Sequence, residues 1–265
     1  MRQPDVVIDK SFLQGASRDQ LRSLFERHRV LMTEKLFYEL LTTCPAVRAR
    51  CFKRIFQIGT PMIPVQNVTA ILRWEVKNQR SLTSIDNVVE DKRFRFNPGL
   101  ADKDFKFGEK DVRAIEKWNQ ENSVRVHDFA YHCSKVPVRF PALKGYHPGT
   151  TPTTQIEEIK KRLCAEPAFL RELYRPGRGG TWPTKDQIDG QWAIYRWLQI
   201  RVVAALDYFR KYGERDVSSE AKKVVNDYHD LEYCLVGCLV GAIATKDSGL
   251  SKRFLALCPL GKVLR

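Results

Sequence analysis

Acidic residues stand at the ends of predicted elements or at the edges of their apolar faces. They are Asp9, Glu39, Asp227, Asp230 and Asp247. Several carboxylates in one pocket repel one another and do not all ionise without a compensating cation. Mg²⁺ or Mn²⁺ would compensate them, because these ions prefer oxygen ligands and are held by a few carboxylates plus water. The chemistry expected of such a site is hydrolysis of a phosphate ester by an activated water.

Two of these acids follow apolar segments typical of buried strands. Asp9 ends the segment DVVID, and Asp247 lies two residues beyond AIAT. In a parallel α/β sheet, sites form at the carboxyl ends of the strands. We therefore expect both carboxylates to point into the same crevice.

Two more acids open the segment NDYHDLEYCLVGCLVG, which is helical by composition and spacing. Asp230 lies one helical turn before Cys234 and prolongs the apolar stripe that should face the sheet. Asp227 lies on nearly the same side of the helix and competes with Asp230 as the candidate ligand. On the helix after the second strand, Glu39 borders the apolar face, and Glu34 competes less strongly. Asp230 is the first choice as ligand in this segment.

Each acid also has a structural alternative. Asp9 is equally suited to capping a loop, and Asp227 to capping the second of two helices. Glu39 is placed to pair with Lys35 one turn earlier. Asp247 is suited to opening the turn TKDSGL. A purely structural explanation must account for all of them falling on the functional side of one sheet.

The elements that position the acids lie at the two ends of the chain. In the first 56 residues we predict strands at 5–9 and 29–32. A helix begins after the first strand, at the capping box of Ser17 and Gln20, and two more helices, 33–43 and 45–56, follow the second strand. The last fifty predict a helix that breaks near Asn226, then 242–245 (strand), 249–258 (helix) and 262–264 (strand). Strands alternating with helices indicate a parallel sheet covered on both faces.

The middle of the chain differs from both ends. It contains loop-like segments and two long helical ones, 153–174 with an interruption near Pro167, and a second from Thr184, where a T-x-x-Q capping box occurs. Seven cysteines include no CxxC pair, so a structural zinc site is not expected. We predict a core formed by 1–59 and 216–265, interrupted by a mostly helical insertion, 60–215.

The charge balance favours a polyanionic partner, most simply nucleic acid. The 265 residues include 45 Lys and Arg against 31 Asp and Glu, a formal net charge of +14. The candidate phosphate-binding residues are Arg48, Arg50, Lys53 and Arg54, together with Arg175 and Arg178 in the glycine-rich ELYRPGRGGTWP. A solvated face and a plain basic loop are the structural alternatives for these two groups.

Membrane association is not expected. No apolar run approaches the roughly 20 residues that a membrane helix needs, and the N-terminal MRQPDVVIDK lacks a signal-peptide layout. The default expectation is a cytoplasmic protein.

At these residues the sequence resembles a PIN-like nuclease domain. The matching motifs are a first strand ending in Asp (VVIDKS), a helical Glu some thirty residues later (TEKLFYELL), and DLEYCLVGCLVGAIATKD. The resemblance covers about 1–56 and 216–265. It implies a Rossmann-like three-layer α/β/α fold and Mg²⁺- or Mn²⁺-dependent cleavage, usually of RNA.

The resemblance also implies roles for particular residues. Asp9, Glu39, Asp230 and Asp247 would surround the metal, with Asp227 as a competing ligand. Thr245 would hold the site through its hydroxyl, and Ser11 would support Asp9. The sequence departs from the family pattern at Lys10, where a small polar residue is usual, and in the length of the 60–215 segment.

The resulting hypothesis is an endoribonuclease, with RNA as partner and the 60–215 segment shaping the substrate channel or binding an inhibitor or partner protein. One alternative is a catalytically inactive PIN-like scaffold that binds RNA or protein, with the Lys10 ammonium in place of the metal. Another is a phosphatase on a related fold, although D-K-S at Asp9 lacks the D-x-D pair of aspartyl-phosphate chemistry.

Overall fold

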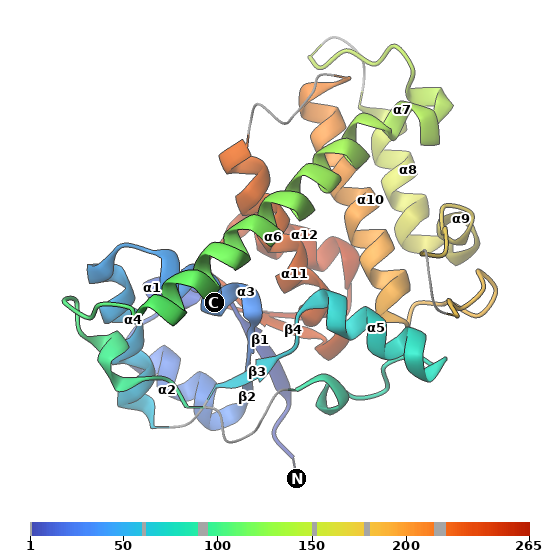
Figure 1. Ribbon diagram of the computed structural model, residues 1–265. Coiled ribbons are helices and arrows are strands. Elements are labelled where there is room, and N and C mark those ends of the chain that lie inside the picture. The colour runs from blue at the N-terminus through green and yellow to red at the C-terminus, as the bar shows by residue number, and fades with distance from the viewer. Residues whose placement is uncertain (1, 60–61, 90–94, 150–152, 178–180, 215–220) are drawn as a thin grey trace. The chain divides into compact units, whose positions relative to one another are not determined.

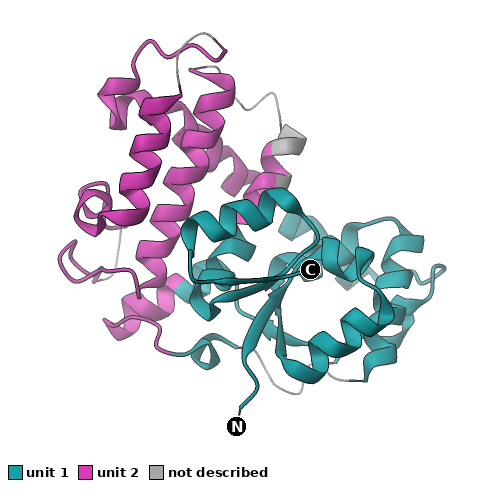
Figure 2. Cartoon of the chain, turned by 180° about the vertical axis from the view of Figure 1, so that it is seen from behind, with its two compact units in different colours: residues 1–71, 84–119, 232–265 teal, residues 72–83, 120–231 magenta. Residues whose placement is uncertain are grey.

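The computed structural model describes the chain apart from residues 1, 60–61, 90–94, 150–152, 178–180 and 215–220 (Figure 1). The chain divides into two compact units (Figure 2). Unit 1 comprises 1–71, 84–119 and 232–265, and unit 2 comprises 72–83 and 120–231. This division differs from the predicted segments, because residues 84–119 of the expected insertion belong with the sheet.

Unit 1 is built on a five-stranded sheet in which every pair of neighbouring strands is parallel. The strands are β1 (Asp5–Ile8), β2 (Arg29–Thr33), β3 (Ile63–Val65), β4 (Ala242–Ala244) and β5 (Lys262–Leu264). Their order is β3-β2-β1-β4-β5. Val7 of β1 pairs with Leu31 on one side and with Ile243 on the other. The predicted α/β class with a central parallel sheet is confirmed.

The centre of the sheet is fully buried, which explains its continuous apolar strands. Val6, Val7 and Ile8 of β1 have no exposed surface, and neither has Ile243 of β4. The edge strand β3 reads IPV. Its proline is tolerated because an edge strand has one unpaired side.

Helices connect the strands of unit 1 and lie on both sides of the sheet (Figure 2). They include α1 (Lys10–Gly15), α2 (Arg18–Arg27), α3 (Glu34–Thr42), α4 (Pro45–Ile58) and α12 (Ser248–Leu257). The path from β1 through β2 to β3 runs toward one edge, and the path from β4 to β5 runs toward the other. Since such crossovers are right-handed, α1–α4 and α12 cover opposite faces.

Side-chain caps fix where these helices begin. Ser17 and Gln20 form the predicted capping box at the start of α2, and Thr33 accepts from the Leu36 amide at the start of α3. Pro45 occupies the first turn of α4, as predicted.

Unit 2 is helical in its described parts. It contains α7 (Val136–Arg139), α8 (Thr154–Ala165), α9 (Pro167–Arg171) and α10 (Ala193–Tyr212). Three further helices, α5 (Val68–Asn78), α6 (Glu109–Ser134) and α11 (Ala221–Val240), have residues in both units. Short 3₁₀ turns occur at Ile85–Val88, Pro98–Ala101 and Pro141–Leu143. The interruption expected near Pro167 separates α8 from α9. Among the described helices, none combines the length and apolar character needed to span a bilayer.

Three sequence-based expectations were wrong in detail. The helix predicted from Thr184 begins at Ala193. The Gln187 side chain does accept from the Thr184 amide, but no helix follows it directly. The break expected near Asn226 is absent, because α11 is continuous from Ala221 to Val240. The segment treated as a helical insertion also supplies β3 to the sheet.

The distant cap of α10 explains its late start. Glu75, on α5, has no exposed surface, and its carboxylate accepts from the amides of Ala193 (2.7 Å) and Ile194 (2.9 Å). It also accepts from the Leu82 amide at 2.9 Å. A carboxylate at a helix N-terminus satisfies amides that the helix itself leaves unpaired. Burial raises the pKa of Glu75, while these three amides oppose the rise.

Candidate active site at the ends of β1 and β4

The strand order creates a switch point between β1 and β4. From this point the chain proceeds to β2 on one side and to β5 on the other. Crevices outside the carboxyl ends of the strands at such a point are the usual ligand sites of open α/β sheets. Asp9 directly follows β1, and Thr245 directly follows β4. The topology therefore brings these two residues together where a site is expected.

The Asp9 carboxylate is buried and held by three hydrogen-bond donors. Its Oδ2 accepts from the Thr245 hydroxyl at 2.6 Å, and its Oδ1 accepts from the Phe12 amide at 2.8 Å. The Ser11 hydroxyl lies 2.9 Å from Oδ1 and 2.8 Å from Oδ2. The Phe12 bond also caps α1, so the structural and site roles weighed for Asp9 occur together. The carboxylate is thereby fixed in one orientation.

The two hydroxyls belong to a network that links the strand ends. Ser11 Oγ and Thr245 Oγ1 are 3.2 Å apart. Ser11 Oγ accepts from the Lys246 amide at 2.8 Å, and Thr245 Oγ1 accepts from the Asp247 amide at 3.0 Å. Because each hydroxyl also accepts, its proton is directed toward Asp9. Thr245 was expected to contact the site through its hydroxyl, and Ser11 was expected to contact Asp9. Both contacts are present.

The electrostatics of the site disfavour an ionised Asp9. Burial raises the pKa of Asp9, and the negative charge of Glu39 raises it further. The hydrogen bonds from Thr245, Phe12 and Ser11 act in the opposite direction. A cation beside a carboxylate with this balance favours its ionised form.

Glu39 is held by a residue that the sequence reasoning did not single out. The hydroxyl of Tyr233, on α11, donates a 2.6 Å hydrogen bond to Glu39 Oε2. Tyr233 is buried, and Glu39 is half-buried. The signal in the sequence is weak, because Tyr233 is one of two tyrosines in NDYHDLEYC. The contact is between residues 194 positions apart.

Asp247 is exposed and caps α12. Its Oδ1 accepts from the Leu250 amide at 2.8 Å. The structural role of Asp247 is therefore that of a helix cap, where the sequence suggested the opening of a turn. The main-chain amide of Asp247, rather than its carboxylate, donates to the Thr245 hydroxyl. Its part in holding a metal stays a prediction.

The two acids of α11 lie in the part of that helix assigned to unit 2, and both are half-buried. Asp227 accepts from the Tyr208 hydroxyl at 2.5 Å. Burial raises the pKa of Tyr208, and the bond to Asp227 raises it further. On the helix, Asp230 precedes Tyr233 by three residues, so the two side chains share one side. The structure thus gives Asp227 a partner inside unit 2.

The donor set at the switch point fits a hard divalent cation. Asp9 and Glu39 supply carboxylate oxygens, and Mg²⁺ is often held by one or two carboxylates plus water and substrate phosphate. The observation behind this fit is the raised pKa of Asp9, which is caused chiefly by burial and to a smaller extent by the charge of Glu39. Within the described residues, no three or more His, Cys, Asp and Glu side chains form a group that could hold a metal ion. The four-carboxylate site therefore stays a prediction.

The basic residues of α4 divide into internal and external ones. Arg48 is 3% exposed and donates to the Phe105 carbonyl at 3.0 Å, which is not compatible with the predicted phosphate-binding role. Arg54 donates to the carbonyls of Leu13 (2.6 Å) and Ala16 (2.7 Å). Both guanidinium groups therefore donate to main-chain carbonyls within the protein.

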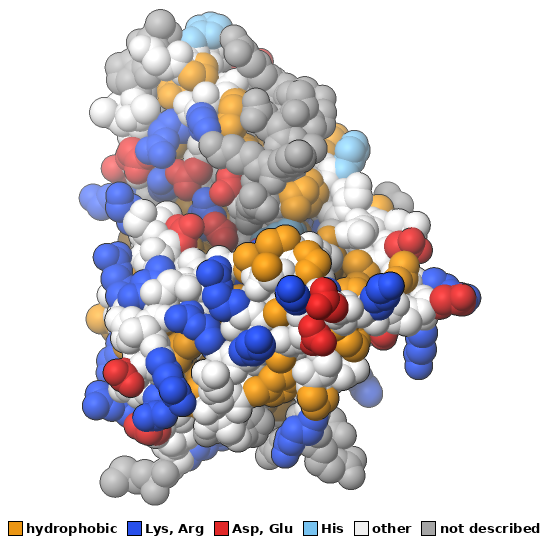
Figure 3. Space-filling model, turned by 90° about the vertical axis from the view of Figure 1, so that its left-hand side faces the viewer, with side chains coloured by type: hydrophobic (Ala, Val, Ile, Leu, Met, Phe, Trp, Pro, Cys, Tyr) orange, Lys and Arg blue, Asp and Glu red, His pale blue; other side chains and the backbone are white. Residues whose placement is uncertain are grey.

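Arg50 and Lys53 are exposed on the same helix. On the side of unit 1 that carries α1, α2 and α4, Lys and Arg side chains outnumber Asp and Glu (Figure 3). Of the second predicted group, Arg175 is exposed in unit 2, and Arg178 lies outside the described residues.

Comparison with protein family models, with curated proteins and with solved structures found no match.

Proposed function

We propose that this protein is a metal-dependent nuclease with a PIN-like, three-layer α/β/α unit. It hydrolyses phosphodiester bonds, and it prefers those of RNA to those of DNA. The observation that carries the proposal is the buried Asp9 carboxylate at the switch point. It is oriented by Thr245 and Ser11 and lies in the field of Glu39. The strand order and the positions of these residues support the PIN-like resemblance of the sequence.

In this proposal, Asp9 and Glu39 hold Mg²⁺ or Mn²⁺, with Asp230 and Asp247 as further predicted ligands. When bound, the ion lowers the pKa of a water and stabilises the charge that develops on the phosphate. Thr245 and Ser11 keep the Asp9 oxygens in place, and Tyr233 does the same for Glu39. These positioning residues restrict the carboxylates to one arrangement before substrate arrives.

Binding of the substrate follows from charge. The net charge of +14 attracts a polyanion, and Arg50 and Lys53 are exposed candidates for phosphate contacts. Contacts to the backbone phosphates position a strand without reading its sequence.

The experiment that tests the proposal uses labelled RNA incubated with the purified protein and Mn²⁺, with and without EDTA. The Asp9→Asn and Glu39→Gln variants run in parallel, with Asp104→Asn as a control because Asp104 is an exposed loop carboxylate. The expected result is cleavage by the parent and the control alone, abolished by EDTA. EDTA-resistant cleavage, or active Asp9→Asn protein, would contradict the mechanism.

Two other outcomes separate the alternatives. RNA binding without cleavage by the parent would favour the inactive scaffold, in which the Lys10 ammonium takes the place of the metal. Hydrolysis of p-nitrophenyl phosphate with intact RNA would favour the phosphatase.

A further inference from the structure

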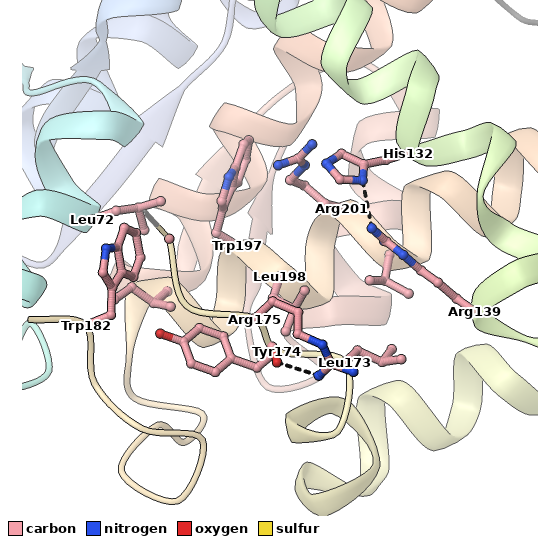
Figure 4. Close-up of a pocket in the computed structure, with 13 residues that line it drawn as sticks. Leu72, His132, Arg139, Leu173, Tyr174, Arg175, Trp182, Trp197, Leu198 and Arg201 are labelled. Carbon is pink, nitrogen blue, oxygen red and sulfur yellow. Dashed lines mark hydrogen bonds between the residues drawn. The ribbon is translucent and has the colours of Figure 1, made fainter. Parts of the chain in front are cut away.

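Unit 2 contains a cavity of ≈ 310 Å³, which is within the usual size range of small-ligand sites. Its walls come from α5, α6, α7, α10 and the segment that follows α9. Three guanidinium groups, one imidazole and several aromatic rings line it (Figure 4). Neither β1 nor any other strand contributes to it, so it is separate from the carboxylate site.

One side of the cavity is cationic. Figure 4 shows Arg139, Arg201 and His132 together, and it shows the Arg175 guanidinium turned back onto the Tyr174 carbonyl, 2.7 Å away. Arg139 Nη2 lies 2.7 Å from His132 Nδ1, and since a guanidinium can only donate, His132 accepts. Burial lowers the pKa of His132 to about 4, and the charge of Arg201 contributes to this. Arg139 therefore has a neutral partner at physiological pH.

The positive charges on this side repel one another. Burial lowers the pKa of Arg139, and the charges of Arg201 and Arg175 lower it further. The lining residues within the described part of the chain include no Asp or Glu. Nearby, Asp128 pairs with Arg201 at 2.8 Å, while Glu172 pairs with Lys185 at 2.9 Å. Among the described residues, Arg201 is thus paired with Asp128, while Arg175 donates to the main-chain carbonyls of Glu172 and Tyr174. A multiply charged anion would balance the remaining positive charge.

The other side of the cavity is aromatic. Trp182 and Tyr174 lie there, beside Leu72 (Figure 4). The indole of Trp182 packs on Gly177, where a Cβ would come within 2.3 Å of the ring. The Tyr174 hydroxyl donates to the Pro183 carbonyl at 3.0 Å, which fixes that ring as well. Fixed aromatic rings are suited to stacking against a planar heterocycle.

We propose that this cavity binds a nucleoside monophosphate, with the phosphate between Arg139, Arg175 and Arg201 and the base against Trp182 and Tyr174. A dianionic phosphate matches the guanidinium side, and a planar base matches the aromatic side. The same chemistry is found in a free nucleotide and in the phosphorylated end of a strand. The proposal does not depend on nuclease activity, because it concerns unit 2 alone.

The test is calorimetric titration of the whole protein with AMP, UMP, inorganic phosphate and adenosine at low salt. A nucleotide should bind about tenfold or more tightly than phosphate or adenosine, because only the nucleotide occupies both sides. Nucleotide binding no tighter than that of phosphate would overturn the proposal.

Two variants separate the two sides of the cavity. Arg175→Gln, at an exposed position, should weaken nucleotide and phosphate binding alike by about tenfold. Trp182→Leu should weaken nucleotide binding and leave phosphate binding unchanged. Arg210→Gln removes the same charge from an exposed site outside the cavity and should bind as the parent does. Parent-like affinity in Arg175→Gln, or equal losses in Arg175→Gln and Arg210→Gln, would contradict the proposed site.

The ligand could be a free nucleotide or the phosphorylated end of a strand. A short RNA with a 5′-phosphate, compared with its 5′-hydroxyl form and with AMP, distinguishes these two ligands. Tighter binding of the phosphorylated strand than of AMP identifies a strand end, and the reverse identifies a free nucleotide. Equal binding of the phosphorylated and hydroxyl strands overturns recognition of the phosphate. The Asp9→Asn variant should bind nucleotide normally, so loss of cleavage and loss of nucleotide binding are distinguishable.

Discussion

The hydroxyl of Thr245, at the end of β4, donates a 2.6 Å hydrogen bond to Asp9, at the end of β1. This bond joins the two central strands at the switch point and stabilises the ionised form of a buried carboxylate.

Removing the Thr245 hydroxyl should therefore impair the site more than the fold. In Thr245→Val, the Asp9 pKa should rise and the acidic limb of the pH–rate profile for Mn²⁺-dependent cleavage should move to higher pH. The free energy of unfolding should fall by about 1–3 kcal/mol, because Asp9 and the Asp247 amide each lose a partner. Thr245→Ser, which keeps the hydroxyl, should restore the profile, and an unshifted profile in Thr245→Val would refute its positioning role.

The pH dependence of stability should carry the signature of Asp9. Its pKa in the folded protein is raised above 3.8, chiefly by burial, so the folded protein binds this proton more tightly than the unfolded chain. The resulting stabilisation is present below pH 3.8 and is lost as the pH rises through the folded-state pKa. Urea unfolding should therefore be measured for Asp9→Asn and the parent at about pH 4 and about pH 7. The free energy of unfolding of Asp9→Asn relative to that of the parent should be higher at about pH 7 than at about pH 4. A pH-independent difference would show that Asp9 does not titrate as described.

Glu75 should be the most sensitive single position in unit 2. Glu75→Ala leaves the buried amides of Leu82, Ala193 and Ile194 without their acceptor, and should cost about 3–5 kcal/mol in urea unfolding. Glu75→Gln keeps an acceptor oxygen and should cost less. Lys77→Ala, at an exposed position of the same helix, is the control and should be close to neutral. Equal effects of Glu75→Ala and Lys77→Ala would rule out the distant cap.

The two acids of α11 should separate by function. Asp227 holds the Tyr208 hydroxyl, so Asp227→Ala should lower the free energy of unfolding by about 1–2 kcal/mol, while Asp227→Asn should retain cleavage because an amide oxygen still accepts. Asp230→Asn should lose Mn²⁺-dependent cleavage if Asp230 is the ligand. The reverse pattern in the cleavage assay would assign the metal to Asp227.

Exposed cations of α4 should contribute to RNA affinity through salt-dependent contacts. Replacing Arg50 and Lys53 together by Gln should weaken binding and reduce the slope of log K against log salt by about 1.4, since each phosphate contact to a single strand contributes about 0.7. The paired control is Lys252→Gln, an exposed lysine on α12, which should leave the slope unchanged. A slope unaltered in the double variant would remove α4 from the RNA-binding surface.

Much of the sheet could be predicted because its strands are short apolar segments next to clear helix caps. VVI, VLM and AIA carry that signal. The edge strand β3 was missed, since its three residues include a proline that normally argues against a strand. The helix α6 was also missed. Its first half is rich in charged and polar residues, and its buried residues, Val126, Phe129, Ala130 and Cys133, all lie in its second half.

The positions of Asp9 and Thr245 could be predicted, because each directly follows an apolar strand segment. Contacts between distant segments could not. Neither the Tyr233 bond to Glu39 nor the Glu75 cap of α10 has a local sequence signature, because each depends on helices brought together by the fold. Arg48 and Arg54 show the same difficulty: in the sequence they belong to one basic stretch with Arg50, and only packing turns them inward.

The separation of Asp9 and Thr245 by 236 positions has a consequence for synthesis of the protein. On the ribosome, β1, β2 and their helices emerge early, and β4 follows only after the whole of unit 2 has been translated. Until then the edge of β1 lacks its partner strand and Asp9 lacks the hydroxyl that orients it. A growing chain is thus unable to complete the hydrogen bonds around Asp9 until nearly all of it has been translated.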